Sequence, residues 1–378
     1  MYKSQEKGEA LKVLQVLSRS AGGIRQHVAS LNKELNKQGI ESYIIGPTKV
    51  MDDLEVQTYS FKKTSIKNPL SFLDPIKKIK IISNGFDVIH AHGLSAGYFV
   101  YLTFMFKKNK PLVILTMHNH AHSFEGKIKY TIKKFAQNIL FSKVDQVICP
   151  SKFSLEQLQV KSKYKDKFSV ILPIGQTLDE KRKEKAVSSR QRICDNWSIK
   201  RNDKVYVSIA RLHPQKNLPL LIDAFSKLTE KNSEAKLFVV GSGTEKYKDY
   251  LEKYVKASSL GGKVFFTGYV DVFEILSIAD VMVLSSEYET VPLVLIESLF
   301  MGVPVVMSKT GIANEVLNGE NGEVIEQLDS QFLCDTMIKW GANVDLPNFD
   351  RSKLSETALK LVDTQNNVSK IIKLYKTN

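Results

Sequence analysis

Residues 280–306 read DVMVLSSEYETVPLVLIESLFMGVPVV, in which a polar turn and a long apolar run lie between two short β-branched runs. The short runs predict strands. The middle run predicts a helix that starts near Pro292, because proline suits a first helical turn. Glu289 then lies in the loop after the strand, and Glu297 lies in the second turn of the helix. Two solvated glutamates and two carboxylates that grip one ligand are both consistent with this spacing.

The same alternation of strands and helices continues in both directions along the chain. Strands are predicted at 11–17, 42–46, 86–92, 111–118, 145–151 and 168–173, and again at 204–210, 235–241, 263–268, 280–286, 303–308 and 322–326. Strands joined by long crossovers form parallel sheets with both faces covered. The predicted fold class is therefore α/β, with two doubly wound domains whose strand ends face a central cleft.

The composition places the domain boundaries. Residues 1–175 form the predicted N-terminal domain, residues 176–190 a polar, highly charged linker, and residues 191–354 the C-terminal domain. The stretch 355–378 is predicted to be a terminal helix that crosses back to the N-terminal domain.

Charge and cysteine content suggest the cellular setting. The net charge is +14, and residues 1–200 carry 34 Lys and Arg against 17 Asp and Glu, which suggests an anionic partner. The start shows no secretory signal, and the longest apolar run (97–106) is about half of a membrane span. Three distant cysteines indicate reduced thiols. We therefore expect a cytoplasmic protein, in part at the inner face of the membrane.

One segment concentrates the positive charge. Residues 127–143 read KIKYTIKKFAQNILFSK, with Ile128, Ile132, Phe135 and Ile139 at helical spacing among lysines. Such a helix can lie in a lipid interface, although its apolar face could equally pack on the sheet.

Several polar residues follow predicted strands. Arg211 and Lys216 could hold a diphosphate or be ordinary surface charges. Gly22 and Gly23 allow a close backbone approach to a ligand or form a plain tight turn, and no G-x-G-x-x-G fingerprint accompanies them.

Five of the seven histidines lie close together in the sequence, after two predicted strands. Alternating histidines can chelate a metal, and they can equally form a polar wall that contacts substrate. The five are His90, His92, His118, His120 and His122.

These blocks together resemble a known family. IARLHPQKN, VVGSG, VFFTGYV, the 280–306 stretch and GIANEVLNGENG occur in the family's order, and GGIRQHVASLNKELNKQG, DVIHAHG and TMHNH precede them. The chain resembles a retaining glycosyltransferase of the family 4 (group 1) type, with the GT-B fold of two Rossmann-like domains. The resemblance covers nearly the whole chain.

The resemblance implies residue roles. Glu289 would bind hydroxyls of the donor sugar and Glu297 the ribose of the nucleotide, while Arg211 and Lys216 hold the diphosphate. His118 would contact the transferred sugar. The other implied donor-binding residues are Gly22, Gly23, Gly241, Tyr269, Thr290, Val291 and Leu293.

The implied reaction is the retaining transfer of a hexose from a nucleotide-diphosphate sugar to a lipid-linked or anionic glycan acceptor, in cell-envelope polysaccharide or glycolipid synthesis. No cofactor and no metal are expected, because an Asp-x-Asp motif is absent. Thr290 and Val291 replace the family's usual glycine and aromatic residue, which leaves the sugar open. Ala210 and Ile174 also depart from the pattern.

Three rival functions are kept. The histidines could build a metal-dependent hydrolase, and the same fold could carry a nucleotide-sugar epimerase. A basic nucleic-acid-binding protein is the third, but no binding motif supports it, and no nucleic acid is expected as a partner.

Overall fold

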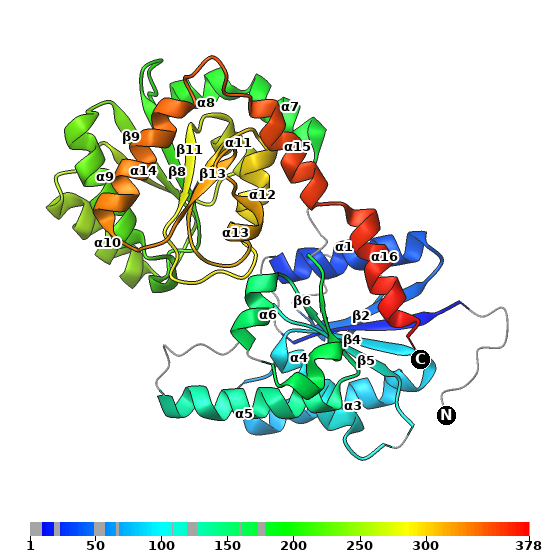
Figure 1. The fold of residues 1–378 in the computed structure, drawn as a ribbon. Helices are drawn as coiled ribbons and strands as arrows, with labels where there is room; N and C mark the ends of the chain where they lie inside the picture. Colours follow the sequence, from blue (N-terminus) through cyan, green and yellow to red (C-terminus); the bar gives the residue numbers. More distant parts are fainter. Residues whose placement is uncertain are drawn as a thin grey trace. The chain divides into compact units, whose positions relative to one another are not determined.

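The computed structural model describes residues 10–18, 23–48, 57–65, 68–107, 109–118, 127–158, 160–172 and 178–377. The chain divides into two compact units, with residues 1–176 and 362–378 in unit 1 and residues 177–361 in unit 2 (Figure 1). Each unit is built on one parallel sheet, so the α/β prediction is confirmed.

Unit 1 holds a seven-stranded sheet in the order β3-β2-β1-β4-β5-β6-β7. Its strands are β1 (Lys12–Leu17), β2 (Glu41–Pro47), β3 (Thr58–Phe61), β4 (Val88–His92), β5 (Leu112–Thr116), β6 (Gln146–Cys149) and β7 (Phe168–Val170). Its helices are α1 (Gly23–Lys37), α3 (Leu73–Ile82), α4 (Leu94–Phe104), α5 (Lys127–Lys143), α6 (Lys152–Leu158) and α16 (Thr364–Tyr375).

Both faces of this sheet are covered because its strands are apolar on both sides. Leu14 of β1 joins the cluster that contains Phe99 of α4 and Leu140 of α5. Its neighbour Val13 points the other way and packs in the cluster that contains Leu31 of α1. A strand buried on both faces needs two helical layers, and the crossovers of a parallel sheet supply them.

Unit 2 holds a six-stranded sheet in the order β10-β9-β8-β11-β12-β13. Its strands are β8 (Lys204–Ile209), β9 (Ala235–Val240), β10 (Val264–Gly268), β11 (Val281–Leu284), β12 (Val305–Ser308) and β13 (Gly322–Ile325). Its helices are α7 (Glu180–Ser188), α8 (Arg190–Asn196), α9 (Leu218–Lys231), α10 (Glu245–Ala257), α11 (Val272–Ser277), α12 (Leu293–Phe300), α13 (Ala313–Val316), α14 (Ser330–Asn343) and α15 (Arg351–Leu361). Short 3-10 turns in the chain are η1 (Pro69–Phe72), η2 (Ser83–Gly85), η4 (Ser162–Lys167) and η5 (Pro214–Lys216).

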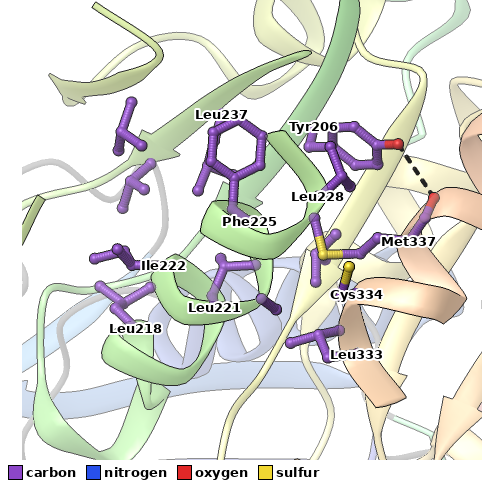
Figure 2. Packing of buried hydrophobic residues seen from close by; sticks show 14 of the residues in the cluster. Tyr206, Leu218, Leu221, Ile222, Phe225, Leu228, Leu237, Leu333, Cys334 and Met337 are labelled. Atoms are coloured by element: carbon purple, nitrogen blue, oxygen red, sulfur yellow. Dashed lines mark hydrogen bonds between the residues drawn. The ribbon is translucent and has the colours of Figure 1, made fainter. Parts of the chain in front are cut away.

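The main core of unit 2 lies between helices α9 and α14 and the sheet. Figure 2 shows Phe225 of α9 and Met337 of α14 packed beside Tyr206 of β8. The Tyr206 hydroxyl donates a hydrogen bond to the Met337 carbonyl at 3.2 Å, which satisfies the polar end of a buried aromatic side chain.

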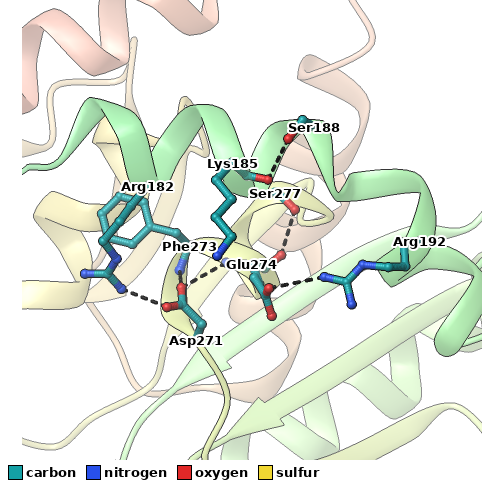
Figure 3. Close-up of polar contacts among 8 residues, drawn as sticks. All are labelled: Arg182, Lys185, Ser188, Arg192, Asp271, Phe273, Glu274 and Ser277. Carbon is teal, nitrogen blue, oxygen red and sulfur yellow. Dashed lines mark hydrogen bonds and ion pairs between the residues drawn. The ribbon is translucent and has the colours of Figure 1, made fainter.

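The polar stretch predicted as a linker (176–190) is instead largely helical from residue 180 on, and its described residues belong to unit 2. Helix α7 begins after Asp179, whose carboxylate accepts from two backbone N–H groups of its first turn. Arg182 of α7 pairs with Asp271 at 2.8 Å and lies over the ring of Phe273, and Arg192 of α8 pairs with Glu274 (Figure 3). The charges that suggested a solvated linker thus attach these helices to α11.

The C-terminal stretch predicted as one helix (355–378) contains the end of α15 and all of α16. The break falls at Val362 and Asp363, and the Asp363 carboxylate caps α16. Residues 362–378 group with unit 1, where Val368 and Tyr375 are buried against the sheet face that α1 also covers. The chain therefore starts and ends in the same unit.

Helix α5 exposes part of its apolar face. Ile132 is 63% exposed and Phe135 68% exposed, so packing on the sheet does not account for these two side chains. Leu140 and Phe141, nearer the end of the helix, are buried. The side chain of Ile128 lies outside the described residues. Among the described residues, no helix has both the length and the apolar character that crossing a bilayer requires.

Candidate functional site

In each parallel sheet the strand order reverses at one point, between β1 and β4 in unit 1 and between β8 and β11 in unit 2. In unit 1, β1 lies between β2 and β4, and in unit 2, β8 lies between β9 and β11. At such a point the connections that follow the two neighbouring strands run to opposite faces of the sheet. This leaves room for a ligand at the carboxyl ends of the strands. The loops after β8 and β11 contain Arg211, Lys216 and Glu289, so the predicted residues of unit 2 lie at this switch point.

A buried ion pair joins the two loops of unit 2. The Lys216 ammonium contacts the Glu289 carboxylate, and their side chains are 14% and 10% exposed. The Ser286 hydroxyl donates a second hydrogen bond to the same carboxylate oxygen at 2.8 Å. Two residues that are 73 positions apart are thus held side by side.

Residues not anticipated from the sequence hold these loops in place. The Ser285 hydroxyl donates to the carbonyl oxygens of Lys216 and Asn217 at 3.0 and 3.1 Å. The side-chain amide of Gln215 donates to the Tyr288 carbonyl at 2.8 Å, and the backbone N–H of Glu287 donates to the Gln215 carbonyl. A serine after a strand carries no distinctive signal, so only the structure identifies these contacts.

Gly311 is a further residue that the sequence analysis left without a role. Its φ is +57°, and an added Cβ would lie 2.4 Å from the Thr290 carbonyl oxygen. The loop after β12 therefore packs directly under the backbone that carries Glu289. A glycine is needed here both for its backbone conformation and for the close approach.

Helix α12 follows the Glu289 loop. Pro292 is its N-cap, one position before the predicted first turn, and makes no side-chain cap, so the first-turn N–H groups receive no side-chain acceptor from the N-cap residue. Such an N-terminus attracts phosphate. Thr290, Val291 and Leu293 are half-buried around it.

Glu297 lies in the second turn of α12, as predicted. Burial raises its pKa to about 7, although the nearby Arg182 acts in the opposite direction. A carboxyl group with this pKa exists in both protonation states near neutral pH. It can therefore accept hydrogen bonds from ligand hydroxyls. When no ligand is bound, its negative charge is costly because the group is buried.

The remaining predicted residues of unit 2 differ in their surroundings. Arg211 is exposed, and Tyr269, just after β10, is 92% exposed. Gly241 has a φ of +133°, and an added Cβ would lie 2.1 Å from the Ala210 carbonyl oxygen. Close packing between the ends of β8 and β9 is thus enough to require glycine at 241, whether or not it contacts a ligand.

The predicted residues of unit 1 are only partly described. Gly22, His120 and His122 lie outside the described residues, and Gly23 is the first residue of α1. His118 lies two residues after β5, and its Nε2 is 3.4 Å from Nδ1 of His92, which ends β4. The structure thus brings together histidines from the two predicted groups.

His90 has a different environment from its neighbours. Its Nδ1 is 2.7 Å from the Tyr375 hydroxyl, and its Nε2 is 2.7 Å from the Thr116 hydroxyl. Both ring nitrogens are therefore occupied inside the core. Burial lowers the pKa of His90 to about 3, and it also holds the pKa values of His92 and His118 well below 6.5. The three imidazoles are neutral at physiological pH.

A cavity of about 700 Å³ lies at the opposite, amino-terminal edge of the sheet in unit 2. Part of its charged lining is paired, since Lys204 contacts Asp345 at 2.6 Å and Asp280 accepts a hydrogen bond from the Val205 backbone. These pairs fasten strand starts and are distant in the fold from the carboxyl-end loops.

Two family models match this chain. The family model for Glycosyltransferase Family 4 matches residues 21–173, and the model for Glycosyl transferases group 1 matches residues 189–358. Together the two models cover most of the chain, and their boundary falls near the junction between the two units.

Individual curated relatives share less than a third of their aligned residues with this chain in the two examples that follow. Mannosylfructose-phosphate synthase from Agrobacterium fabrum is 29% identical over 58% of this chain, which spans only 50% of that protein. A UDP-Gal:alpha-D-GlcNAc-diphosphoundecaprenol alpha-1,3-galactosyltransferase from Escherichia coli is 25% identical, over 72% of this chain and 70% of its own length.

Solved structures show the same fold. HepE from Anabaena, crystallised with UDP and glucose, superposes with a TM-score of 0.78 at 17% identity, over 97% of this chain and 100% of that one. The match extends over residues of both unit 1 and unit 2. The family models and the shared fold place this chain in the family 4 (group 1) glycosyltransferases of the GT-B fold.

Proposed function

We propose that the protein transfers a hexose from a nucleotide-diphosphate sugar to an acceptor, with retention of anomeric configuration. The observation that carries the proposal is the buried Lys216–Glu289 pair at the switch point of unit 2. Glu289 lies a few residues before the N-terminus of α12. Such an arrangement offers a cation and backbone N–H groups to phosphates and a carboxylate to sugar hydroxyls.

The residues act in the following way. Arg211 and Lys216 bind the donor diphosphate without a metal or other cofactor, and the α12 N-terminus adds its N–H groups. As the bond between the sugar C1 and the diphosphate oxygen breaks, negative charge grows on the leaving phosphate, and these groups stabilise it. Removal of one such donor costs on the order of 3 kcal/mol of transition-state stabilisation.

The other contacts determine which donor is accepted. Glu289 accepts hydrogen bonds from hydroxyls of the transferred sugar, and Glu297 accepts them from the ribose. Tyr269 presents an exposed ring at which the base can stack. His118 is the residue of unit 1 that we propose for contact with the transferred sugar.

A direct test separates donor binding from transfer. A thermal-shift screen of nucleoside diphosphates and their sugars identifies the donor, because a ligand at 100 times its Kd adds about 2.7 kcal/mol of stability. Glu289→Ala is expected to abolish transfer while the protein stays folded. Glu287→Ala, at an exposed position in the same loop, is the matched control. Full activity of Glu289→Ala would reject the site, and an NMR spectrum of the product would show whether configuration is retained.

The acceptor is proposed to be lipid-linked or an anionic glycan of the cell envelope. The Escherichia coli relative is named for an acceptor on diphosphoundecaprenol. Unit 1 contains most of the basic excess of the chain, which suits an anionic lipid or glycan.

We further propose that unit 1 docks on the anionic inner face of the membrane from the cytoplasm. On α5, Ile132 and Phe135 are exposed on one helical face. On the neighbouring α4, Leu102 is 44% exposed, and just beyond that helix Phe106 is 90% exposed. Apolar side chains that remain in water beside a basic helix are the features of an interfacial contact.

Co-sedimentation with phosphatidylglycerol vesicles tests this docking. Binding should rise with the anionic lipid fraction and fall with salt. Phe135→Ser should weaken it, whereas Phe332→Ser, which removes a 43% exposed phenylalanine from unit 2, should not. Equal binding by both variants, or none by the wild-type protein at low salt, would reject docking through α5.

A further inference from the structure

Three imidazoles from separate elements form a triangle in unit 1. His27 is on α1, His92 ends β4 and His118 follows β5, and one ring nitrogen from each lies within 4.8 Å of the others. The ring centres are 5.4, 5.4 and 5.7 Å apart. His27 was not among the histidines expected to cluster, because it lies far from them in the sequence.

The spacing suits a tetrahedral metal ion. Zinc holds imidazole nitrogens at ~2.0–2.1 Å, so that two nitrogens on one tetrahedral ion lie about 3.4 Å apart. His92 Nδ1 and His118 Nε2 are already separated by 3.4 Å. The third nitrogen, from His27, lies within 4.8 Å of the other two and would have to move closer to bind the same ion.

A second layer of hydrogen bonds orients one of the ligands. The buried amide of Gln15 donates to the Ser42 hydroxyl at 3.3 Å, and its oxygen therefore faces His92. That oxygen accepts from His92 Nε2 at 2.6 Å. His92 thus carries its proton on Nε2, and the Nδ1 lone pair points into the triangle. Metal-binding histidines are oriented in this way by a carbonyl partner.

The three imidazoles differ in how far they are covered. His27 is 4% and His92 2% exposed, whereas His118 is only half-buried. The triangle is therefore closed on the side of the sheet and accessible on the side of His118.

We propose that His27, His92 and His118 form a three-histidine site for a divalent transition metal of the zinc type, with the fourth position open to solvent or an anion. This site is separate from the metal-free diphosphate grip of Arg211 and Lys216 in unit 2. Three imidazole nitrogen ligands favour zinc or cobalt over magnesium, which prefers oxygen ligands.

Cobalt(II) provides the test, since a four-coordinate ion gives intense visible bands and a six-coordinate one does not. The full chain is stripped with a chelator and titrated with Co²⁺, then with Zn²⁺. The expected result is one Co²⁺ per chain in a tetrahedral spectrum that Zn²⁺ abolishes. His27→Gln and His118→Gln should each remove the spectrum. His213→Gln, which changes an exposed histidine of unit 2, should keep it.

A milder variant keeps the test decisive if a ligand variant fails to fold. Gln15→Leu leaves all three ligands in place but removes the carbonyl that orients His92, and it should weaken Co²⁺ binding by about 10–100-fold. Far-UV circular dichroism verifies folding of each variant. The proposal is overturned if the folded wild-type protein takes up no Co²⁺ or shows only six-coordinate bands. It is also overturned if folded Gln15→Leu and the folded ligand variants bind as tightly as wild type.

Discussion

The Lys216–Glu289 pair offers a measurable link between the site and the stability of unit 2. Lys216→Met leaves the Glu289 carboxylate, whose side chain is 10% exposed, with the Ser286 hydroxyl as its described side-chain donor. Breaking a buried pair from one side costs about 3–5 kcal/mol, because the remaining charge is uncompensated. Since neither side chain is fully buried, we expect the lower end, about 3 kcal/mol.

A double-mutant cycle isolates the interaction. Glu289→Gln should cost less than Lys216→Met, because the long lysine chain can carry its ammonium to solvent. In the double variant no buried charge is left unpaired. Its loss of unfolding free energy should therefore be smaller than the sum of the two single losses by about 2 kcal/mol. Nucleoside-diphosphate affinity should fall in both variants that lack Lys216.

The assay can be made specific for unit 2. Both tryptophans of the chain, Trp197 and Trp340, belong to this unit, so tryptophan fluorescence in a urea titration follows its unfolding and not that of unit 1. Single losses that add within about 0.5 kcal/mol would show that the two residues do not interact, and the reasoning from the buried pair would be refuted.

Three other expectations follow from the same structure. Glu297 has a pKa of about 7 against 4.5 in the unfolded chain, so its contribution to the stability of unit 2 is lost as pH rises through 7. Glu297→Gln should therefore stabilise unit 2 by about 2 kcal/mol at pH 8 and by less at pH 5. An equal gain at both pH values would contradict this. Gly311→Ala should displace the Thr290 backbone, destabilise unit 2 by about 1–3 kcal/mol in the fluorescence assay and reduce donor binding, whereas wild-type behaviour would show that the loop yields easily. Tyr375→Phe should destabilise unit 1 by about 1–2 kcal/mol in urea titrations followed by circular dichroism, because His90 Nδ1 loses its partner, and an unchanged midpoint would exclude that bond as a stabilising one.

The sequence predicted the sheets well where strands are apolar and long. It missed β3, because Thr58–Phe61 is a four-residue edge strand next to polar segments and has little apolar signal of its own. It also misjudged α7, whose residues are too polar to suggest a packed helix. Arg182 packs through an ion pair and a ring contact rather than through an apolar face, and periodicity does not detect such contacts.

In the candidate site, too, some features could be predicted from the sequence and others could not. Because parallel strands end at one edge, the positions of Arg211, Lys216 and Glu289 could be predicted from strand ends alone. The ion pair could not, since it joins loops that are 73 residues apart and depends on how Ser285 and Gln215 fasten them. The contribution of Gly311 depends on a backbone approach that no side-chain pattern records.

His118 takes part in two of the proposals made for unit 1. As a metal ligand it would bind through Nε2, the atom that lies 3.4 Å from His92 Nδ1. A sugar contact through the same nitrogen would compete with the metal, because one imidazole nitrogen has a single lone pair. Metal occupancy should therefore oppose transfer, and removal of the metal should relieve it. His27 belongs to the triangle alone, so that residue is where metal affinity can be changed while the proposed sugar contact is kept.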